Sequence, residues 1–145
     1  MRFLIDTNVL SAGTAVRARE DVVTWMERNS ADLALSVVTV SEIVSGIAKL
    51  RREGATSKAE RLAAWWAAVE HLHAGRFLAF GLAEARIAGE MSDRARGNGH
   101  APGFADVAIA ATAEAHGLVV LTRNVRHFSI LGVSTADPFE KLPSD

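Results

Sequence analysis

The chain has 145 residues, of which 49% are hydrophobic and 23% are charged, and its formal net charge at pH 7 is −1. A chain of this length can form one sizeable hydrophobic core, so we expect a single domain over residues 1–145. The absence of cysteine excludes disulfides, thiolate nucleophiles and cysteine-based zinc sites. A net charge near zero gives no overall attraction to nucleic acid, which would instead require local clusters of Lys and Arg.

No stretch of the sequence approaches the roughly 20 consecutive apolar residues of a membrane span. The first apolar residues already fit a strand, and no leader with a cleavage site precedes them. We therefore expect a cytoplasmic protein that has no membrane partner.

The chain opens with an apolar segment that runs directly into an acid. Residues 3–5 predict a buried strand that delivers the carboxylate of Asp6 to the edge of a sheet. The residues that follow predict a short helix from Thr7 to Leu10, with Gly13 as its end.

Helical and strand patterns then alternate along the chain. Apolar residues at helical spacing predict helices over residues 20–29, 39–54, 56–74, 82–96 and 104–116. Short apolar runs predict strands over residues 33–38, 76–80, 118–121 and 132–135. A glycine-rich segment between the last two helices predicts a loop. This alternation predicts an α/β fold with three layers, α/β/α, around a mostly parallel central sheet of four or five short strands.

Polar side chains follow the ends of several predicted strands. Asp6 follows the first strand, Glu42 lies in the first turn of the helix after the second, and Asn124 follows the fourth. Asp106 begins a crossover helix that runs antiparallel to the strands, so its first turn returns to the same edge. Because ligands of parallel sheets bind outside the carboxyl ends of the strands, we expect these four side chains to form a site.

Each acid also has a purely structural interpretation. Thr39 and Glu42 have the spacing of a capping box, Asp106 suits the dipole of its helix, and Asp6 with Asn8 fits a turn cap. Taken singly, such acids are more often caps than catalysts. Three acids at one edge, however, repel one another by on the order of 1 kcal/mol per pair, which a divalent cation would remove. Oxygen ligands without cysteine favour Mg²⁺, or Mn²⁺, over zinc.

Four segments resemble, in their order and spacing, the motifs of the PIN domain, and most closely those of VapC/FitB-type toxins from bacterial type II toxin–antitoxin modules. The segments are Ile5–Leu10, Ser41–Ile43, Phe104–Ala111 and Leu121–Asn124. Ala74–Arg76 and the closing Asp137–Phe139 are similar to that group as well.

The resemblance implies a Mg²⁺-dependent endoribonuclease that serves as the toxin of such a module. It implies a cognate antitoxin whose C-terminal segment lies across the acidic cleft, an RNA substrate, a homodimer, and contact with DNA only through the antitoxin. Asp6 and Asp106 would be metal ligands, and Glu42 the third acid, in contact with the metal directly or through water. Asn124 stands where relatives often have a fourth acid, so the resemblance leaves open whether the site binds one metal ion or two.

The residues also indicate how the reaction would proceed. Without cysteine or a serine in a nucleophile elbow, water is the expected nucleophile. A bound metal ion polarises a phosphoryl oxygen and lowers the pKa of its bound water, so the expected product carries a 5′-phosphate. Thr7, Asn8 and Thr122 are expected to hydrogen-bond the metal ligands.

Positive charge for RNA is expected near the motifs. The arginines best placed for RNA are Arg94, Arg96, Arg123 and Arg126. We expect single-stranded or looped RNA, because the metal needs a splayed backbone. A second basic cluster (Lys49, Arg51, Arg52, Lys58 and Arg61) is more typical of solvated surface. His127 is expected to contact phosphate or solvent rather than to replace an acid.

The helix pair over residues 39–74 is expected to carry an apolar patch for a second copy of the chain or for the antitoxin. Trp65 and Trp66 face different directions of a helix, so one of them is expected to remain partly exposed. His71 and His73 are not expected to bind metal, because residues two apart do not share a helix face.

Two other functions remain open. Asp6 could be the nucleophile of an aspartyl phosphatase, although Asn8 replaces the second acid of such enzymes and no lysine follows a later strand. Asn124 leaves open a non-catalytic subunit that only binds the antitoxin.

Overall fold

The computed structural model describes residues 1–11 and 19–144. Gly13, the predicted end of the first short helix, lies outside this part of the chain. The described helices are α1 (Thr7–Leu10), α2 (Glu20–Arg28), the 3₁₀ turn η2 (Ser30–Asp32), α3 (Val37–Arg52), α4 (Thr56–Leu72), α5 (Leu82–Gly97), α6 (Phe104–His116) and α7 (Val125–Ser129). The strands are β1 (Phe3–Ile5), β2 (Leu33–Ser36), β3 (Phe77–Leu78), β4 (Val119–Leu121) and β5 (Thr135–Ala136).

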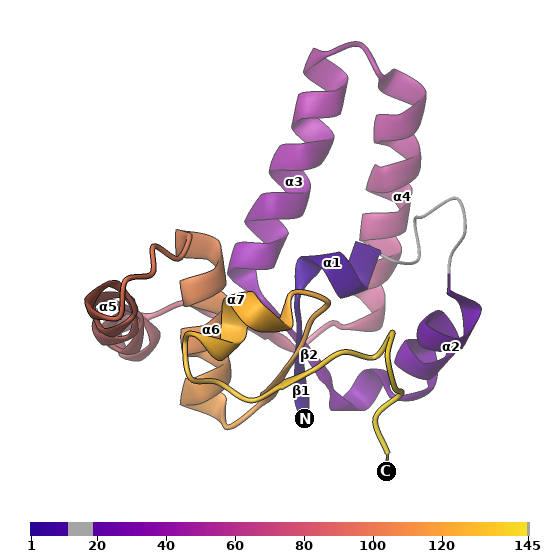
Figure 1. The fold of residues 1–145 in the computed structure, drawn as a ribbon. Helices are drawn as coiled ribbons and strands as arrows, with labels where there is room; N and C mark the ends of the chain where they lie inside the picture. The colour runs from indigo at the N-terminus through magenta and orange to yellow at the C-terminus, as the bar shows by residue number, and fades with distance from the viewer. Residues whose placement is uncertain (12–18, 145) are drawn as a thin grey trace.

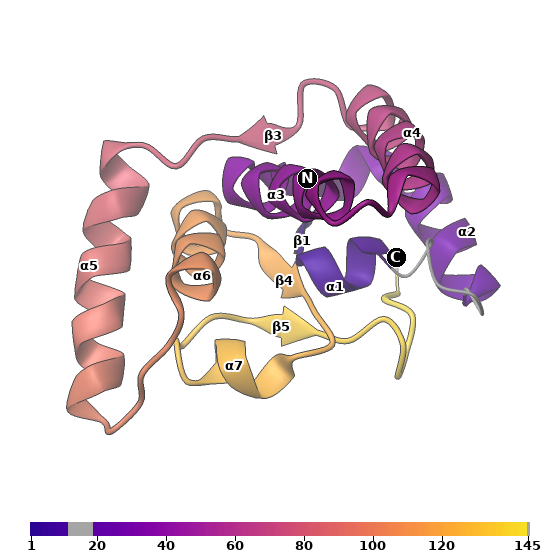
Figure 2. The same ribbon diagram turned by 90° about the horizontal axis from the view of Figure 1, so that it is seen from above.

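The strands form one five-stranded sheet in the order β3-β2-β1-β4-β5, and every neighbouring pair is parallel. In the register of β1 and β4, Ile5 lies opposite Leu121. The carboxyl ends of these two central strands are therefore level, and the residues that follow them meet at the same edge (Figures 1 and 2).

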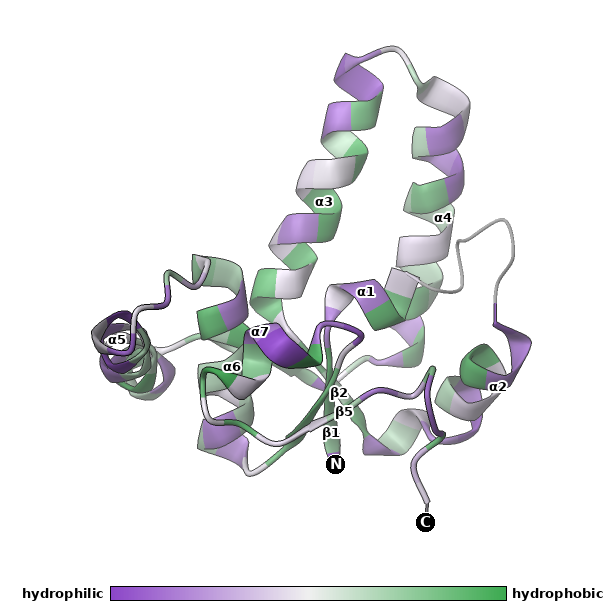
Figure 3. Ribbon diagram, viewed as in Figure 1, coloured by the Kyte–Doolittle hydropathy of each residue, from purple (hydrophilic) through white to green (hydrophobic). Residues whose placement is uncertain are grey.

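Alternate residues of β1 face opposite sides of the sheet, as the period of a strand requires. Phe3 and Ile5 pack into a core with α2, α3 and α4, whereas Leu4 packs into a second core with α5 and α6. This arrangement confirms the predicted three-layer α/β/α fold. The central strands are mostly green in Figure 3, as expected for strands that are buried on both faces.

Helices α3 and α4 lie side by side as an antiparallel hairpin that rises away from the sheet (Figure 1). Trp66 is buried while Trp65 is partly buried, which confirms the expectation for this pair. The second basic cluster is exposed on this hairpin. No helix in the described part of the chain has both the length and the apolar character needed to cross a membrane.

The predicted second strand was too long. Strand β2 ends at Ser36, and Val37 and Val38, which we expected in the strand, form the first turn of α3. The side chain of Ser36 accepts a hydrogen bond from the Val38 backbone N–H at 3.0 Å, so the helix is capped at Ser36. Thr39, whose spacing from Glu42 suggested a capping box, instead lies within the first turn of α3, and its side chain is buried.

Other boundaries also differ from the prediction. Strand β3 has two residues instead of five, and β5 begins at Thr135, where we expected it to end. Helix α7 was not predicted, because five residues are too few to show a helical period.

We expect Ser36→Ala to lower the free energy of unfolding by about 1 kcal/mol, because it removes the cap of α3. In a domain of this size that corresponds to a drop in Tm of about 2–4 °C, which differential scanning calorimetry can measure. Ser41→Ala, at an exposed position of the same helix, is the matched control. An equal Tm for the two variants would contradict a stabilising cap at Ser36.

Candidate active site

Asp6 occupies the point where β1 ends and α1 begins. It is the N-cap of α1, and only 6% of its surface is exposed. One carboxylate oxygen, Oδ1, accepts a hydrogen bond from the Thr7 backbone N–H at 2.8 Å. The other, Oδ2, accepts one from the Thr122 hydroxyl at 2.8 Å. Both oxygens are therefore fixed in place by residues that follow β1 and β4.

The pKa of Asp6 is raised above its ordinary value of 3.8. Burial is the largest cause, because it removes water from the charged carboxylate. The hydrogen bonds from Thr122 and Thr7 lower the pKa, and the nearby carboxylates of Asp106 and Glu42 raise it further. Asp106 and Glu42 therefore lie close enough to Asp6 to influence its carboxylate electrostatically.

The other two acids each have a neighbour of their own. Glu42 Oε1 accepts a hydrogen bond from the Thr7 hydroxyl at 3.0 Å. Asp106, in the first turn of α6, has its Oδ2 3.6 Å from Nδ1 of His127 on α7. Thr7 therefore bridges Asp6 and Glu42, while α7 supplies a partner for Asp106.

A second set of bonds joins the segments after β1 and β4. The Asn124 backbone N–H donates to the Thr122 hydroxyl oxygen at 2.9 Å, so that hydroxyl directs its own proton to Asp6. The Arg123 backbone N–H donates to Asn8 Oδ1 at 3.2 Å. Asn8 therefore contacts the segment after β4 rather than an acid, and Asn124 is exposed at its end.

No three His, Asp or Glu side chains in the described residues are grouped closely enough to hold a metal ion. The donor set nevertheless fits a hard divalent cation, because Mg²⁺ and Mn²⁺ prefer carboxylate oxygens. A cation would also offset the repulsion that Asp106 and Glu42 exert on Asp6. The assignment of Asp6, Asp106 and Glu42 as metal ligands stays a prediction.

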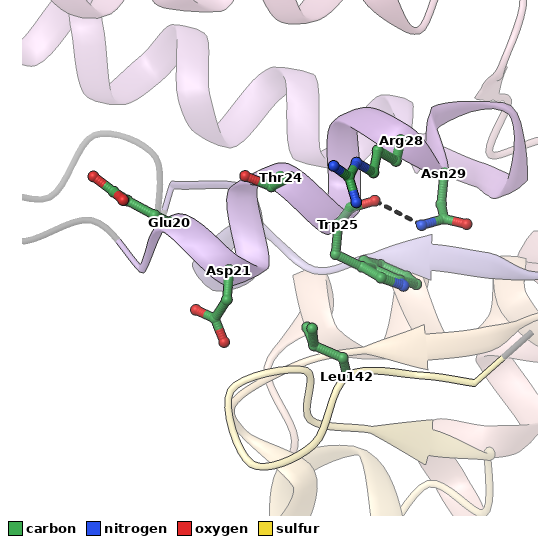
Figure 4. Close-up of a pocket in the computed structure, with 7 residues that line it drawn as sticks. All are labelled: Glu20, Asp21, Thr24, Trp25, Arg28, Asn29 and Leu142. Atoms are coloured by element: carbon green, nitrogen blue, oxygen red, sulfur yellow. Dashed lines mark hydrogen bonds between the residues drawn. The ribbon is translucent and has the colours of Figure 1, made fainter.

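A hollow of about 210 Å³ opens beside Asp106. It is lined by His100, Ala101, Pro102, Gly103, Asp106, His127 and Ile130. The larger hollow in Figure 4, about 610 Å³, lies between α2 and the C-terminal segment and includes Trp25 and Leu142. None of the candidate site residues lines this hollow.

Sequence reasoning missed two contacts near the acids. One is the approach of His127 to Asp106, and the other is the stacking of the Arg123 guanidinium on Phe139, with its carbon 4.2 Å from the ring centroid. Neither pair has a spacing that could reveal it in the sequence. Arg94, Arg96 and Arg126 are exposed. His73 is buried and His71 is exposed.

We expect Asp6→Asn to raise the Tm at neutral pH, because it removes a charge that burial disfavours. Since the pKa of Asp6 is higher in the folded chain than in the unfolded chain, the folded chain keeps this proton where the unfolded chain has released it. The contribution of Asp6 to stability is therefore present at low pH and is lost as the pH rises from 3.8 through the raised value.

The difference in Tm between Asp6→Asn and the wild type should accordingly widen between about pH 4 and pH 8 when metal is absent, with about 2–4 °C for each kcal/mol of relief. Asp93→Asn, an exposed position on α5, controls for loss of charge. A lower Tm for Asp6→Asn at pH 8 would mean that its hydrogen bonds outweigh its burial.

Comparison with known proteins agrees with this geometry. Residues 3–132 match the PIN domain. The VapC ribonuclease Y4jK of Sinorhizobium fredii is 32% identical, and the match covers 94% of this chain and 97% of that protein. Toxin FitB of Neisseria gonorrhoeae is 34% identical with the same coverage.

Among solved structures, FitAB bound to the IR36 DNA fragment superposes with a TM-score of 0.75 at 31% identity, over 94% of this chain and 95% of that one. The fold, the order of the motifs and these relatives agree. The chain therefore belongs to the PIN domain family and, within it, to the group of VapC and FitB.

Proposed function

We propose that the chain is a metal-dependent endoribonuclease that acts as the toxin of a type II toxin–antitoxin module. The observation that carries this proposal is the buried carboxylate of Asp6, whose pKa is raised in part by Asp106 and Glu42. A buried carboxylate whose pKa is raised by two other acids suits a site that takes up a cation. Relatives named as a ribonuclease and as a toxin support the choice of reaction and role.

In this proposal, Asp6, Asp106 and Glu42 hold Mg²⁺ or Mn²⁺. When bound, the ion polarises a phosphoryl oxygen and lowers the pKa of bound water. The protein contributes a preorganised ligand, since Thr122 and the Thr7 backbone fix both oxygens of Asp6 beforehand. Glu42, held by the Thr7 hydroxyl, orients the attacking water. Asn124, whose side chain is neutral, lies at the same edge of the sheet. His127 contacts a phosphate of the substrate.

The nucleophile is water, and the product carries a 5′-phosphate. A covalent intermediate on Asp6, as in an aspartyl phosphatase, is the weaker alternative. The second acid of such enzymes is replaced by Asn8, whose Oδ1 accepts a hydrogen bond from the Arg123 backbone N–H at 3.2 Å.

The cognate antitoxin is the proposed protein partner, in the cytoplasm, and DNA is reached only through it. A solved complex of a relative, FitAB bound to DNA, supports this arrangement. The surface proposed for the antitoxin lies between α3 and α4, where a mostly apolar hollow of about 340 Å³ includes Ile47, Leu50 and Trp65. Val44, on α3, is 50% exposed.

A second copy of the chain is proposed to cover another apolar surface, on α5 and α6. Leu82 and Phe104 are 69% and 68% exposed there. They lie on the two helices that border a second apolar hollow of about 340 Å³, which Phe104 itself lines. Contiguous exposed apolar side chains beside an apolar hollow are a feature of protein interfaces.

One observation favours a second candidate function. Because no three acids are grouped closely enough for a metal within the described residues, a non-catalytic subunit that binds only the antitoxin is the alternative to the ribonuclease.

We expect Asp6→Asn and Asp106→Asn each to lower Mg²⁺-dependent cleavage of single-stranded RNA by at least about 100-fold, because each removes a ligand charge. Glu42→Gln should have a smaller effect, and EDTA should abolish cleavage. Gel analysis of end-labelled RNA gives the rates and the chemistry of the new ends. Asp93→Asn is the matched control.

Unchanged activity in both Asp variants would contradict the assignment of the acids. A 2′,3′-cyclic phosphate end would contradict water as nucleophile, and no cleavage by the wild type would favour the non-catalytic subunit.

We expect Val44→Glu to weaken antitoxin binding and leave the mass of the free chain unchanged. Phe104→Glu should leave antitoxin binding unchanged and should halve the mass of the free chain, as measured by light scattering. Each variant is the control for the other, because both place a charge on an exposed apolar site. If Phe104→Glu keeps the wild-type mass, α5 and α6 are not the self-association surface.

A further inference from the structure

The closing segment of the chain places one aromatic ring within contact distance of two arginines. The ring of Phe139 lies under the Arg123 guanidinium, 4.2 Å from its carbon to the ring centroid, and under that of Arg19 at 5.5 Å. These distances are within the range of favourable cation–π contact. The nuclease mechanism proposed above gives Phe139 no task.

The position of Phe139 is fixed by its own turn. Its backbone N–H donates to Asp137 Oδ1 at 2.9 Å. The Asp137 carbonyl in turn accepts from Glu140 and Lys141, both at 3.2 Å. The segment begins at β5, which pairs with β4, and the Thr122 backbone N–H donates to Ala136 at 3.0 Å. The ring is therefore anchored to the strand end that carries Thr122 and Arg123.

The backbone of Arg123 lies next to the segment that carries Asp6. Its backbone N–H donates to Asn8 at 3.2 Å, and its neighbour Thr122 donates to Asp6 at 2.8 Å. The residue that stacks on Phe139 thus follows immediately the residue that holds the buried carboxylate.

The two arginines on the ring differ in their charge partners. Arg19 forms two hydrogen bonds of 3.0 Å with the Asp21 carboxylate, so its charge is paired. Arg123 makes no ion pair with any residue that the structure describes. A guanidinium that lies over a ring can still offer its in-plane N–H groups, which match the geometry of a phosphate.

We propose that Phe139 is a positioning residue that holds the Arg123 guanidinium beside the acidic centre, where it binds an RNA phosphate next to the one that is cleaved. This inference rests on the ribonuclease function proposed above. Fixing the side chain in advance reduces the freedom that Arg123 loses when RNA binds. The stack therefore acts on substrate affinity and not on the chemical step.

The test measures KM and kcat for cleavage of a short single-stranded RNA. We expect Phe139→Ala and Arg123→Ala each to raise KM by about 3- to 10-fold, the range that cation–π and phosphate contacts allow, with kcat changed less than about twofold. The double variant should be no worse than Arg123→Ala alone, because Phe139 acts through Arg123. Phe139→Trp should restore KM, and Arg19→Ala should leave it unchanged.

If the KM of the double variant rose by the product of the two single increases, the proposal would be overturned. A KM for Phe139→Trp well above the wild-type value would overturn it too. If Arg19→Ala raised KM as much as Arg123→Ala, the phosphate contact would not be specific to Arg123, and the proposal would be overturned.

A binding measurement separates this inference from the ribonuclease proposal. The fluorescence anisotropy of the same labelled RNA, with Ca²⁺ in place of Mg²⁺, reports affinity without cleavage. If the wild type cleaves no RNA but binds it, with the same loss in Phe139→Ala and Arg123→Ala, the ribonuclease proposal fails and the positioning role stands. If the wild type cleaves RNA and the two variants bind it as tightly as the wild type, the positioning role fails and the ribonuclease proposal stands.

Discussion

The structure of the site depends on one constraint, which is that a carboxylate is buried at the end of a strand that is itself buried on both faces. The parallel register of β1 with β4 sets Ile5 opposite Leu121, so Asp6 is placed beside Thr122 whatever the surrounding helices do. Hydrogen bonds from Thr122 and Thr7 lower the pKa of Asp6, but burial and the neighbouring acids raise it more. The fold thus supports a charge that it only partly compensates. The uncompensated charge lowers the stability of the folded chain, and a cation bound at this position would restore it. Such a loss of stability is common at functional sites.

The class of the fold was predictable because it depends on patterns that are local in sequence. Helical spacing and short apolar runs alternate, and that alternation permits few arrangements other than a covered parallel sheet. The boundaries were not predictable in the same way. Val37 and Val38 are β-branched and suit a strand, yet a hydrogen bond from the Val38 backbone to Ser36 starts a helix there. Strand β3 exists only through its pairing with β2, and two residues carry no period.

The candidate site divides along the same line. The convergence of Asp6, Glu42 and Asp106 followed from where strands end and crossover helices begin, which the order of elements determines. Their individual contacts did not follow. Thr122 bonds Asp6 across 116 residues of sequence, and the approach of His127 to Asp106 depends on α7, which has no sequence signal of its own. Sequence order therefore indicates which residues meet, whereas packing decides how each one is held.

The charge of the chain gives the C-terminal segment a reason to be ordered. A protein with a net charge of −1 and a group of acids at its centre repels a polyanion unless positive groups stand close to that centre. Adding more arginines is one solution, but a flexible arginine loses much of its freedom when it binds. Placing Arg123 over the ring of Phe139 is another solution, because the guanidinium carbon lies 4.2 Å from the ring centroid and the side chain makes no ion pair with a described carboxylate. In the positioning role proposed for Phe139, the turn at Asp137 and the pairing of β5 with β4 hold the ring, and with it the Arg123 side chain, next to the segment that carries Thr122.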